Sequence, residues 1–368
     1  MSAAFNPTER ERYQRHFILA GFGPAAQEKL RRGTVLVIGA GGLGCPALLY
    51  LAAAGVGRIL VIDPDRVEAS NLQRQVLYTE QDIGQFKAAV AARRLSALNS
   101  GIVIEPRVGR FSRANALNLV GACDVVIDGS DNFPTRYLVN DACVMAGKPF
   151  VYGAVQGFAG QLSVFNWRGG PTYRCLFPEP PPAGEVPNCA EAGILGVLPG
   201  LIGTGQACEA IKLLTGLGEP LSGRLLLWDA LAMTTQCVSL PADPRNREIT
   251  QLPPDGYGEA CAAPVMGIEE IDVVSLRKAV PTPQLIDVRE RWEREMGSIE
   301  LSIHVPLGLL ERDEAKGALA GLDPAAPTVV YCAVGVRSVR GAQLLRDRHG
   351  FRNPLNLRGG FDEWQRRR

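Results

Sequence analysis

The chain has 368 residues, about twice the usual size of one domain, so two domains are the first expectation. Its 39 basic and 38 acidic residues almost cancel, which removes any general electrostatic reason to expect nucleic acid or an acidic membrane as the partner. The sequence has no apolar run of roughly 20 residues, and its N-terminus is polar, so we expect a cytoplasmic protein without a membrane span or signal peptide.

The first half of the sequence alternates short β-branched runs with helical patterns. Five runs are predicted strands: residues 34–39, 58–63, 103–106, 124–128 and 149–153. Helices are predicted at about residues 43–54 and 84–98. This alternation predicts a Rossmann-like α/β fold, with a mostly parallel sheet flanked by helices.

Between Pro241 and Pro264 the composition shifts to proline, glycine, aspartate and asparagine, as expected of a linker. A second, smaller α/β pattern follows, with predicted strands at residues 284–287, 302–305, 328–332 and 354–357. We therefore expect one domain over residues 1–245, a linker over 246–267 and a second domain over 268–368.

Nine cysteines are scattered through the sequence without a paired framework. In a reducing compartment such thiols are more often buried, catalytic or metal-binding than disulfide-bonded. Five of them lie in apolar runs and are expected in the core: Cys45, Cys123, Cys143, Cys208 and Cys237.

The segment GAGGLG contains Gly39, Gly41, Gly42 and Gly44, and it matches the pattern G-x-G-x-x-G. It directly follows a predicted strand and begins a predicted helix, where backbone N–H groups and the helix dipole favour phosphate. Asp63 ends the next strand, where a carboxylate can accept the ribose hydroxyls. Up to this point an NAD-dependent oxidoreductase would show the same pattern.

Residues further along favour a triphosphate. Arg74 and Lys87 place two cations beyond the ribose position, and two cations suit a triphosphate. Asp131, at the end of a later predicted strand, could hold Mg²⁺ against that triphosphate. Each residue alone is equally compatible with a surface cation or a helix-capping aspartate.

Together these motifs resemble the E1-like adenylyltransferases of the MoeB/ThiF family over about residues 8–240. The stretches that carry the resemblance are Arg12 to Arg15, Gly39 to Gly44, Asp63 to Asp65, Asn71 to Gln75, Gly84 to Lys87, Asp131-Asn132 and Arg136. Such enzymes use ATP to adenylate the C-terminal Gly-Gly of a ubiquitin-like sulfur carrier, and they release pyrophosphate.

The resemblance also implies roles for single residues. Asp63 would hold the ribose, Arg74 and Lys87 the phosphates, and Asp131 the magnesium ion. Arg15 would reach the phosphates from the other subunit of a homodimer. The remaining residues implied at the nucleotide site are the four glycines of the loop, Asp65, Asn71, Gln75 and Asn132.

Cys189 follows a proline-rich stretch and resembles the transfer cysteine of the family, although a loop thiol without a task is the alternative. MoeB-like proteins usually carry a structural zinc ion on two Cys-x-x-Cys pairs. Here the first pair keeps only Cys175, and residues 243–249, around the expected second pair, contain no cysteine. We therefore predict no zinc.

Cys332 ends a predicted strand and begins a six-residue loop that closes at Arg337. Backbone N–H groups, a helix N-terminus and Arg337 should place positive potential on its sulfur. With the runs at 285–290 and 357–364, this loop resembles a rhodanese domain over about residues 268–368. The resemblance implies that Cys332 carries a persulfide. The tyrosine phosphatase loop is one residue longer, which favours sulfur over phosphate here.

The sequence thus predicts an adenylyltransferase joined to a sulfurtransferase. ATP activates the terminal glycine of the carrier, and the Cys332 persulfide, assisted by Cys189, converts it to a thiocarboxylate. The expected donor is a persulfide donor such as a cysteine desulfurase, or thiosulfate. The main alternative is an E1 enzyme that passes a ubiquitin-like protein to targets through a Cys189 thioester. A nucleotide-binding sensor and an NAD oxidoreductase are further alternatives.

Overall fold

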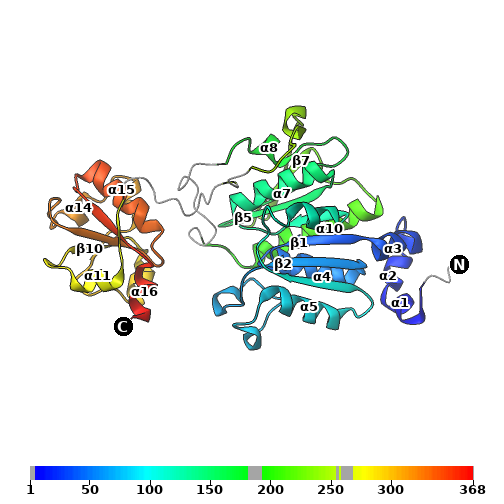
Figure 1. The fold of residues 1–368 in the computed structure, drawn as a ribbon, viewed down its shortest axis with the longest axis horizontal. Helices are drawn as coiled ribbons and strands as arrows, with labels where there is room; N and C mark the ends of the chain where they lie inside the picture. Colours follow the sequence, from blue (N-terminus) through cyan, green and yellow to red (C-terminus); the bar gives the residue numbers. More distant parts are fainter. Residues whose placement is uncertain (1–4, 181–192, 254–256, 258–267, 368) are drawn as a thin grey trace. The chain divides into compact units, whose positions relative to one another are not determined.

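The computed structural model describes residues 5–180, 193–253, 257 and 268–367. These residues form two compact units, one up to Tyr257 and one from Ile268 onward (Figure 1). Within the described ranges no helix combines the length and apolar character needed to cross a membrane.

An eight-stranded sheet forms the centre of the first unit, in the order β3-β2-β1-β4-β5-β6-β7-β8. Strands β1 to β5 pair in parallel, and β6 to β8 extend the sheet in antiparallel fashion. The strand order reverses between β1 and β4, which is where open α/β sheets bind ligands. The strands span Thr34–Ile38 (β1), Arg58–Asp63 (β2), Val103–Val108 (β3), Val125–Asp128 (β4), Phe150–Gln156 (β5), Ala159–Phe165 (β6), Arg224–Asp229 (β7) and Thr234–Ser239 (β8).

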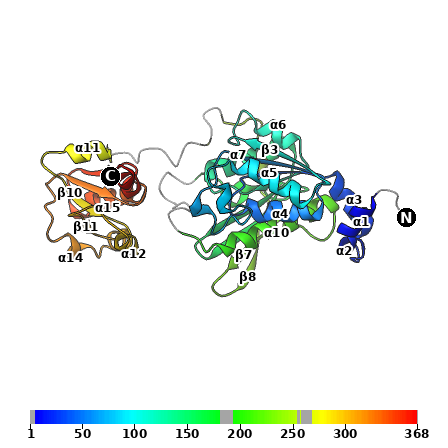
Figure 2. The same cartoon turned by 90° about the horizontal axis from the view of Figure 1, so that it is seen from below.

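Helices cover both faces of this sheet because side chains alternate along each strand. Val35 and Val37 of β1 face a core with α4, α5 and α10, whereas Leu36 and Ile38 face a core with α6 and α7. Figure 2 separates α6 and α7 from α4 and α10 across the sheet. The helices span Pro7–Arg12 (α1), Gln14–Phe17 (α2), Gly23–Arg32 (α3), Gly44–Ala54 (α4), Lys87–Leu98 (α5), Ala116–Gly121 (α6), Phe133–Ala146 (α7), Tyr173–Leu176 (α8) and Val197–Thr215 (α10), with 3-10 turns at Ala69–Asn71 (η1), Glu80–Asp82 (η2) and Pro244–Arg247 (η3).

The second unit is a smaller parallel sheet in the order β11-β10-β12-β13-β9. Helices again pack on two core clusters. Cys332 directly follows β12, so it lies at the edge where the carboxyl ends of the parallel strands meet. The elements span Glu270–Ile271 (β9), Val273–Lys278 (α11), Gln284–Asp287 (β10), Arg291–Glu295 (α12), Ile303–His304 (β11), Leu307–Glu311 (α13), Lys316–Leu319 (α14), Thr328–Tyr331 (β12), Arg337–His349 (α15), Pro354–Leu357 (β13) and Gly360–Arg366 (α16).

The predicted α/β architecture is confirmed, with local differences. The helix predicted from Gly84 begins at Lys87, because Gly84 has φ +85° and the backbone there is left-handed. Cys45, Cys123 and Cys143 are buried as predicted. The prediction was wrong for Cys208 and Cys237, which are exposed. Cys237 lies on β8, an edge strand whose residues are all exposed in the described structure.

Part of the predicted linker packs onto the first unit. Leu252 is buried in the core cluster that contains Tyr137 and Tyr173. The hydroxyl of Tyr257 donates a hydrogen bond to Asp141 at 2.6 Å. Residues 258–267 lie outside the described residues.

Candidate functional site

The Gly39–Gly44 loop joins β1 to α4 at the carboxyl edge of the large sheet. Gly39 has φ +88°, and a Cβ atom there would lie 2.8 Å from the carbonyl oxygen of Gly129. At Gly44 a Cβ atom would lie only 1.9 Å from the carbonyl oxygen of Gly39. Glycine is therefore required at both positions. Among the described residues, a Cβ on Gly41 would meet only the amide of Gln75, at 3.7 Å, so the described structure leaves space beside Gly41.

Asp63 ends β2 beside this loop. Its two carboxylate oxygens accept the backbone N–H groups of Ala40 and Asp65, each at 2.7 Å. Burial raises the pKa of Asp63, whereas the hydrogen bond from Ala40 and the charge on Lys87 oppose that shift. Each carboxylate oxygen has further acceptor capacity, so the group can still accept ribose hydroxyls.

The predicted cations lie next to the same edge. Lys87 is the first residue of α5, and its ammonium group pairs with Asp65 at 3.1 Å. A Cβ on Gly42 would lie 3.6 Å from Cδ of Arg74, so the methylene next to the Arg74 guanidinium group borders the loop. Asn71 anchors the turn that carries Arg74, because its side-chain oxygen accepts the N–H of Glu68 at 3.3 Å.

Asp131 reaches this edge from the turn after β4. It is exposed, and Asn132 caps α7 by accepting the N–H of Thr135 at 3.0 Å. Asp128 stabilises this turn, because its Oδ1 accepts hydrogen bonds from the N–H and the hydroxyl of Ser130, at 3.0 and 2.6 Å. Asp128 is fully buried, and this burial raises its pKa.

Cys332 is buried at the carboxyl edge of the small sheet. The N–H of Gly335 donates to its sulfur at 3.2 Å, and the hydroxyl of Ser338 lies 3.4 Å from it. Arg337 was expected to add positive potential, but both of its terminal nitrogens pair with Glu293, at 2.7 and 2.6 Å. Ser338 and Glu293 were not identified from the sequence.

Comparisons with known proteins agree with this geometry. The ThiF family model matches residues 13–249, and the rhodanese-like domain model matches residues 272–367. This chain belongs to the ThiF family. It carries a rhodanese-like domain after the ThiF region.

The relatives cover the chain to different extents. A sulfur carrier protein adenylyltransferase of Thermus thermophilus is 54% identical over 242 residues, covering 64% of this chain and 89% of the relative. A probable adenylyltransferase/sulfurtransferase MoeZ of Mycobacterium tuberculosis is 41% identical over 382 aligned residues, covering 99% of this chain and 94% of the relative. The crystal structure of E. coli MccB with ATP is 25% identical, with a TM-score of 0.57, and the match covers 65% of this chain and 73% of that chain.

Arg15 does not join the nucleotide-site residues within this ThiF-family chain. It is exposed on α2, next to Tyr13 and His16. The hydroxyl of Tyr13 accepts a hydrogen bond from Asn99, the C-cap of α5, at 2.9 Å. The side chain of His16 bonds to Gln27 at 2.7 Å, and Gln27 donates to the carbonyl of Ala54, the last residue of α4, at 2.8 Å. The glycine loop lies at the other end of α4, which is about 16 Å long by its rise per residue. Figure 1 shows α2 at the end of the sheet where β1 begins.

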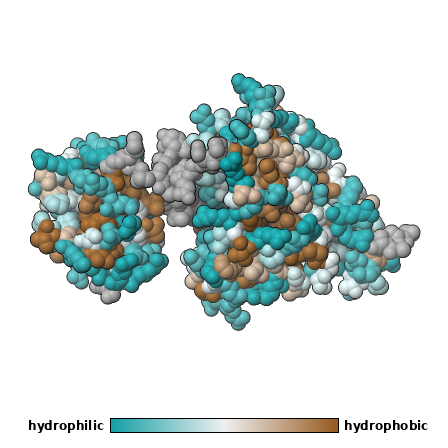
Figure 3. Space-filling model, viewed as in Figure 1, coloured by the Kyte–Doolittle hydropathy of each residue, from teal (hydrophilic) through white to brown (hydrophobic). Residues whose placement is uncertain are grey.

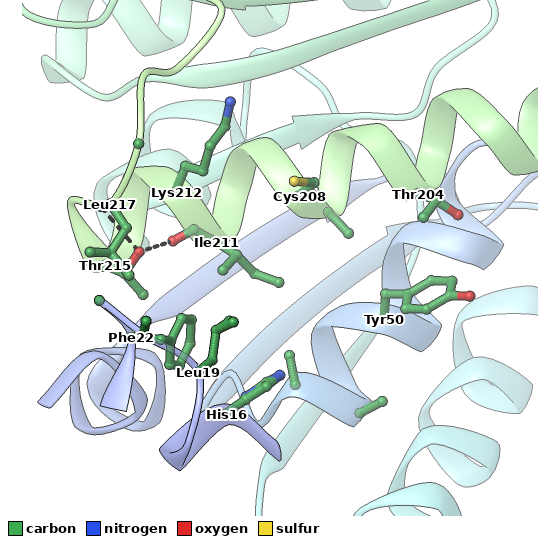
Figure 4. A pocket seen from close by; sticks show the side chains of 16 residues that line it. His16, Leu19, Phe22, Tyr50, Thr204, Cys208, Ile211, Lys212, Thr215 and Leu217 are labelled. Atoms are coloured by element: carbon green, nitrogen blue, oxygen red, sulfur yellow. Dashed lines mark hydrogen bonds between the residues drawn. The ribbon is translucent and has the colours of Figure 1, made fainter. Parts of the chain in front are cut away.

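A groove of about 660 Å³ lies beside α2, between the α2–α3 turn, α4 and α10. Figure 4 shows His16, Leu19 and Phe22 on one side of it and Cys208 and Ile211 on α10. The lining is mostly apolar, and Leu19 keeps 56% of its surface exposed. This groove is distinct from the nucleotide-site edge of the sheet.

The expected zinc positions form a hydrogen-bonded cluster around Cys175. Its sulfur accepts the N–H groups of Thr172 and Asp243, each at 3.3 Å, and the side-chain amide of Asn246 at 3.6 Å. Burial raises the pKa of Cys175, but the hydrogen bonds outweigh it and the pKa is lowered overall. Among the described residues, no three or more His, Cys, Asp or Glu side chains gather as a metal site. The absence of zinc stays a prediction.

Cys189, the predicted transfer cysteine, lies outside the described residues.

The spacing of residues in the sequence could have identified the partners of Cys175. Thr172 and Cys175, like Asp243 and Asn246, have the two-residue spacing of a metal-binding cysteine pair. That spacing predicts that the two pairs meet, as they do around the sulfur of Cys175.

Proposed function

We propose that the first unit adenylates the C-terminal glycine of a ubiquitin-like sulfur carrier protein and that the second unit supplies the sulfur. The observation that carries this proposal is the convergence of Gly39, Asp63, Lys87 and Asp131 at one sheet edge, in a chain that also holds Cys332 in a loop of hydrogen-bond donors. Membership in the ThiF family supports nucleotidyl transfer over NAD-dependent redox chemistry.

In the first step, an oxygen of the terminal carboxylate bonds to the α-phosphorus of ATP and pyrophosphate leaves. The reaction brings two anions together, so it depends on positioning and charge neutralisation. Lys87 and Arg74 border the space beside the glycine loop, and they supply positive charge there. The relative MccB has been crystallised with ATP, which supports the same ligand here.

Magnesium fits the same edge. Asp131 is an exposed carboxylate beside the glycine loop, and carboxylate oxygen is a preferred ligand of Mg²⁺. A bound Mg²⁺ would neutralise charge on the triphosphate. We propose ATP and Mg²⁺ as the cofactors and no zinc. The described cysteines are all free thiols, as in proteins of reducing compartments, which supports a cytoplasmic location.

In the second step, Cys332 takes the outer sulfur of a persulfide donor or of thiosulfate, and the donor leaves with the electron pair of the broken S–S bond. The new persulfide attacks the acyl adenylate, AMP leaves, and an acyl disulfide forms. Attack of a second thiol on the Cys332 sulfur releases the thiocarboxylate and leaves a disulfide for an external thiol to reduce. We propose Cys189 as that second thiol.

An exposed apolar surface beside the glycine loop supports docking of the carrier. It surrounds a small core cluster formed by Leu43, Leu198 and Ile202. The backbone of the β5–β6 turn bonds to Ala230 and bridges to Ile194, so the three exposed segments are neighbours. Figure 3 shows apolar patches that interrupt the hydrophilic surface of each unit. The large exposed side chains of this surface are Phe158, Leu195, Val197, Leu231 and Met233.

The groove beside α2 supports a homodimer. Ile18, Leu19 and Tyr50 expose more than half of their surface around it. A second copy that covers this groove would bury these side chains. In such a dimer, Arg15 of one subunit would lie near the nucleotide site of the other. This arrangement explains why Arg15 is exposed and remote from its own site.

Two assays test the proposal. Carrier-dependent ATP–pyrophosphate exchange reports the first step, and mass spectrometry of the carrier after incubation with ATP and thiosulfate reports the replacement of one oxygen by sulfur. We expect Cys332→Ala to abolish sulfur transfer and to leave exchange intact. Loss of exchange in folded Cys332→Ala protein would contradict the division of labour.

The same experiment distinguishes the E1 alternative. A conjugating enzyme would form a carrier thioester on Cys189 that hydroxylamine cleaves and that persists in Cys332→Ala. Detection of that thioester, with no thiocarboxylate from the wild type, would favour the alternative over sulfur transfer.

A further inference from the structure

Asn356 is a fully buried polar residue of β13 that takes no direct part in the chemistry above. All polar groups of its amide have partners. Its Oδ1 accepts the hydroxyl of Ser338 at 2.6 Å, and its Nδ2 donates to the carbonyl of Gly335 at 3.0 Å and to Glu270 at 2.9 Å. Burial of an amide is unfavourable unless it is hydrogen-bonded, so these three bonds hold it in one orientation.

Two of these partners are the residues that contact the sulfur of Cys332. Gly335 donates its N–H to the sulfur at 3.2 Å, and the hydroxyl of Ser338 lies 3.4 Å from it. Asn356 therefore bonds to both, from the side of β13.

Both contacts need external support. Gly335 has φ +93°, and glycine adopts positive and negative φ about equally readily, so its own backbone preference does not fix the direction of its N–H. Ser338 has one hydroxyl proton, and its shorter hydrogen bond, at 2.6 Å, is to Asn356, so Asn356 determines where the oxygen of Ser338 lies beside the sulfur.

We propose that Asn356 is a positioning residue for sulfur loading: it holds the Gly335 backbone with its N–H on the sulfur of Cys332, and it holds the oxygen of Ser338 beside that sulfur. This inference rests on the proposed role of Cys332. When thiosulfate is the donor, Cys332 attacks its outer sulfur and sulfite leaves with the electron pair of the broken bond. An N–H donor that is already oriented, such as that of Gly335, stabilises charge on the attacking sulfur without reorganising during the reaction.

The test uses the full chain with thiosulfate as donor and cyanide as acceptor. Asn356→Leu keeps the number and branching of the side-chain heavy atoms and removes all three hydrogen bonds. We expect kcat to fall about tenfold or more, because small displacements at a reacting centre have large effects. The KM for thiosulfate should stay within about threefold, because the buried Asn356 is not exposed to substrate.

Gln284→Leu is the matched control. The amide of Gln284, at the opposite edge of the same sheet, also makes three hydrogen bonds, to the backbone O and N–H of Asp323 and to the hydroxyl of Thr328. We expect unchanged kcat and a smaller loss of stability than for Asn356→Leu, because Gln284 is only half-buried. An equal fall in kcat for the control would show that Asn356 acts only through stability, and that result would overturn the proposal.

Further variants keep the test decisive. If Asn356→Leu does not fold, Asn356→Thr places a strand-favouring residue at the same position and still removes the amide. The rate of iodoacetamide alkylation of Cys332, read by mass spectrometry, needs no sulfur donor and should fall in the same variants. Unchanged kcat and alkylation rate in a folded variant would refute the positioning role. Sulfur loading by Cys332→Ser would instead refute the proposed function of the loop.

Discussion

Replacement of Lys87 by methionine separates a catalytic role from a structural one. The lysine side chain is 8% exposed, and its only described ionic partner is Asp65, whose side chain is 63% exposed. Methionine keeps most of the length of the side chain and removes the charge. The freed Asp65 carboxylate can stay hydrated, and the buried Asp63, which loses the nearby charge of Lys87, keeps its hydrogen bonds from the backbone N–H groups of Ala40 and Asp65.

The two expected effects differ in size. An ion pair with a largely exposed partner typically contributes up to about 1 kcal/mol to the free energy of unfolding, a change of about 2 °C in Tm for a unit of this size. A charged donor aimed at the reacting phosphates contributes about 3 kcal/mol to the transition state. That amount corresponds to a fall of about a hundredfold or more in kcat/KM for ATP.

Carrier-dependent ATP–pyrophosphate exchange measures the loss of catalysis, and thermal unfolding followed by circular dichroism measures the loss of stability. Lys148→Met is the control, because Lys148 is half-buried just before β5, at the opposite edge of the sheet. We expect it to leave exchange unchanged. Exchange within threefold of the wild type in folded Lys87→Met protein would show that Lys87 does not bind the phosphates, and a Tm loss of more than about 10 °C would indicate a structural role.

Three further predictions concern the partner subunit and the Cys175 cluster. Arg15→Ala and Lys87→Met should each be inactive in exchange. An equal mixture should recover activity at about a quarter of the sites, because about half of randomly mixed dimers are heterodimers and each heterodimer has one complete site. No recovery would rule out a site shared between subunits. Because the pKa of Cys175 is lowered in the folded state, the wild type should gain stability relative to Cys175→Ser as pH rises from that pKa to the ordinary value of 9.0. Denaturant unfolding at several pH values measures this gain. A stability difference that does not change with pH would contradict the shift. Cysteines introduced together at Thr172, Asp243 and Asn246 would complete a site of four thiols with Cys175. We expect this variant to bind one zinc ion per chain by metal analysis and the wild type to bind none.

The nucleotide-site edge could be predicted from the sequence because it follows from parallel strands. Gly39, Asp63 and Asp128 each come directly at or after the end of a strand, and parallel pairing brings these ends to one edge. The antiparallel extension β6 to β8 was not predicted. All residues of β8 are exposed, so its sequence carries no alternation of buried and exposed positions from which a strand could be recognised.

The charge state around Cys332 could not be predicted from local sequence. Arg337 is 44 residues from Glu293 in the chain, and only the packing of α12 beside the loop brings them together. Asn356 was likewise hidden, because a buried asparagine in a strand has no periodic signal. Arg15 shows a third limit: its resemblance to a family residue implied a role, but only the fold shows that it lies at the far end of α4.

The Arg337–Glu293 pair has a consequence for how sulfur donors approach the loop. The arginine is 20% exposed and the glutamate 11%, so the pair presents little net charge to solution. The exposed side chains within the loop itself are the apolar Val334 and Val336. An anionic donor would therefore find little long-range attraction, and its association rate should depend only weakly on ionic strength. Encounter at this loop would be governed by shape and short-range contact.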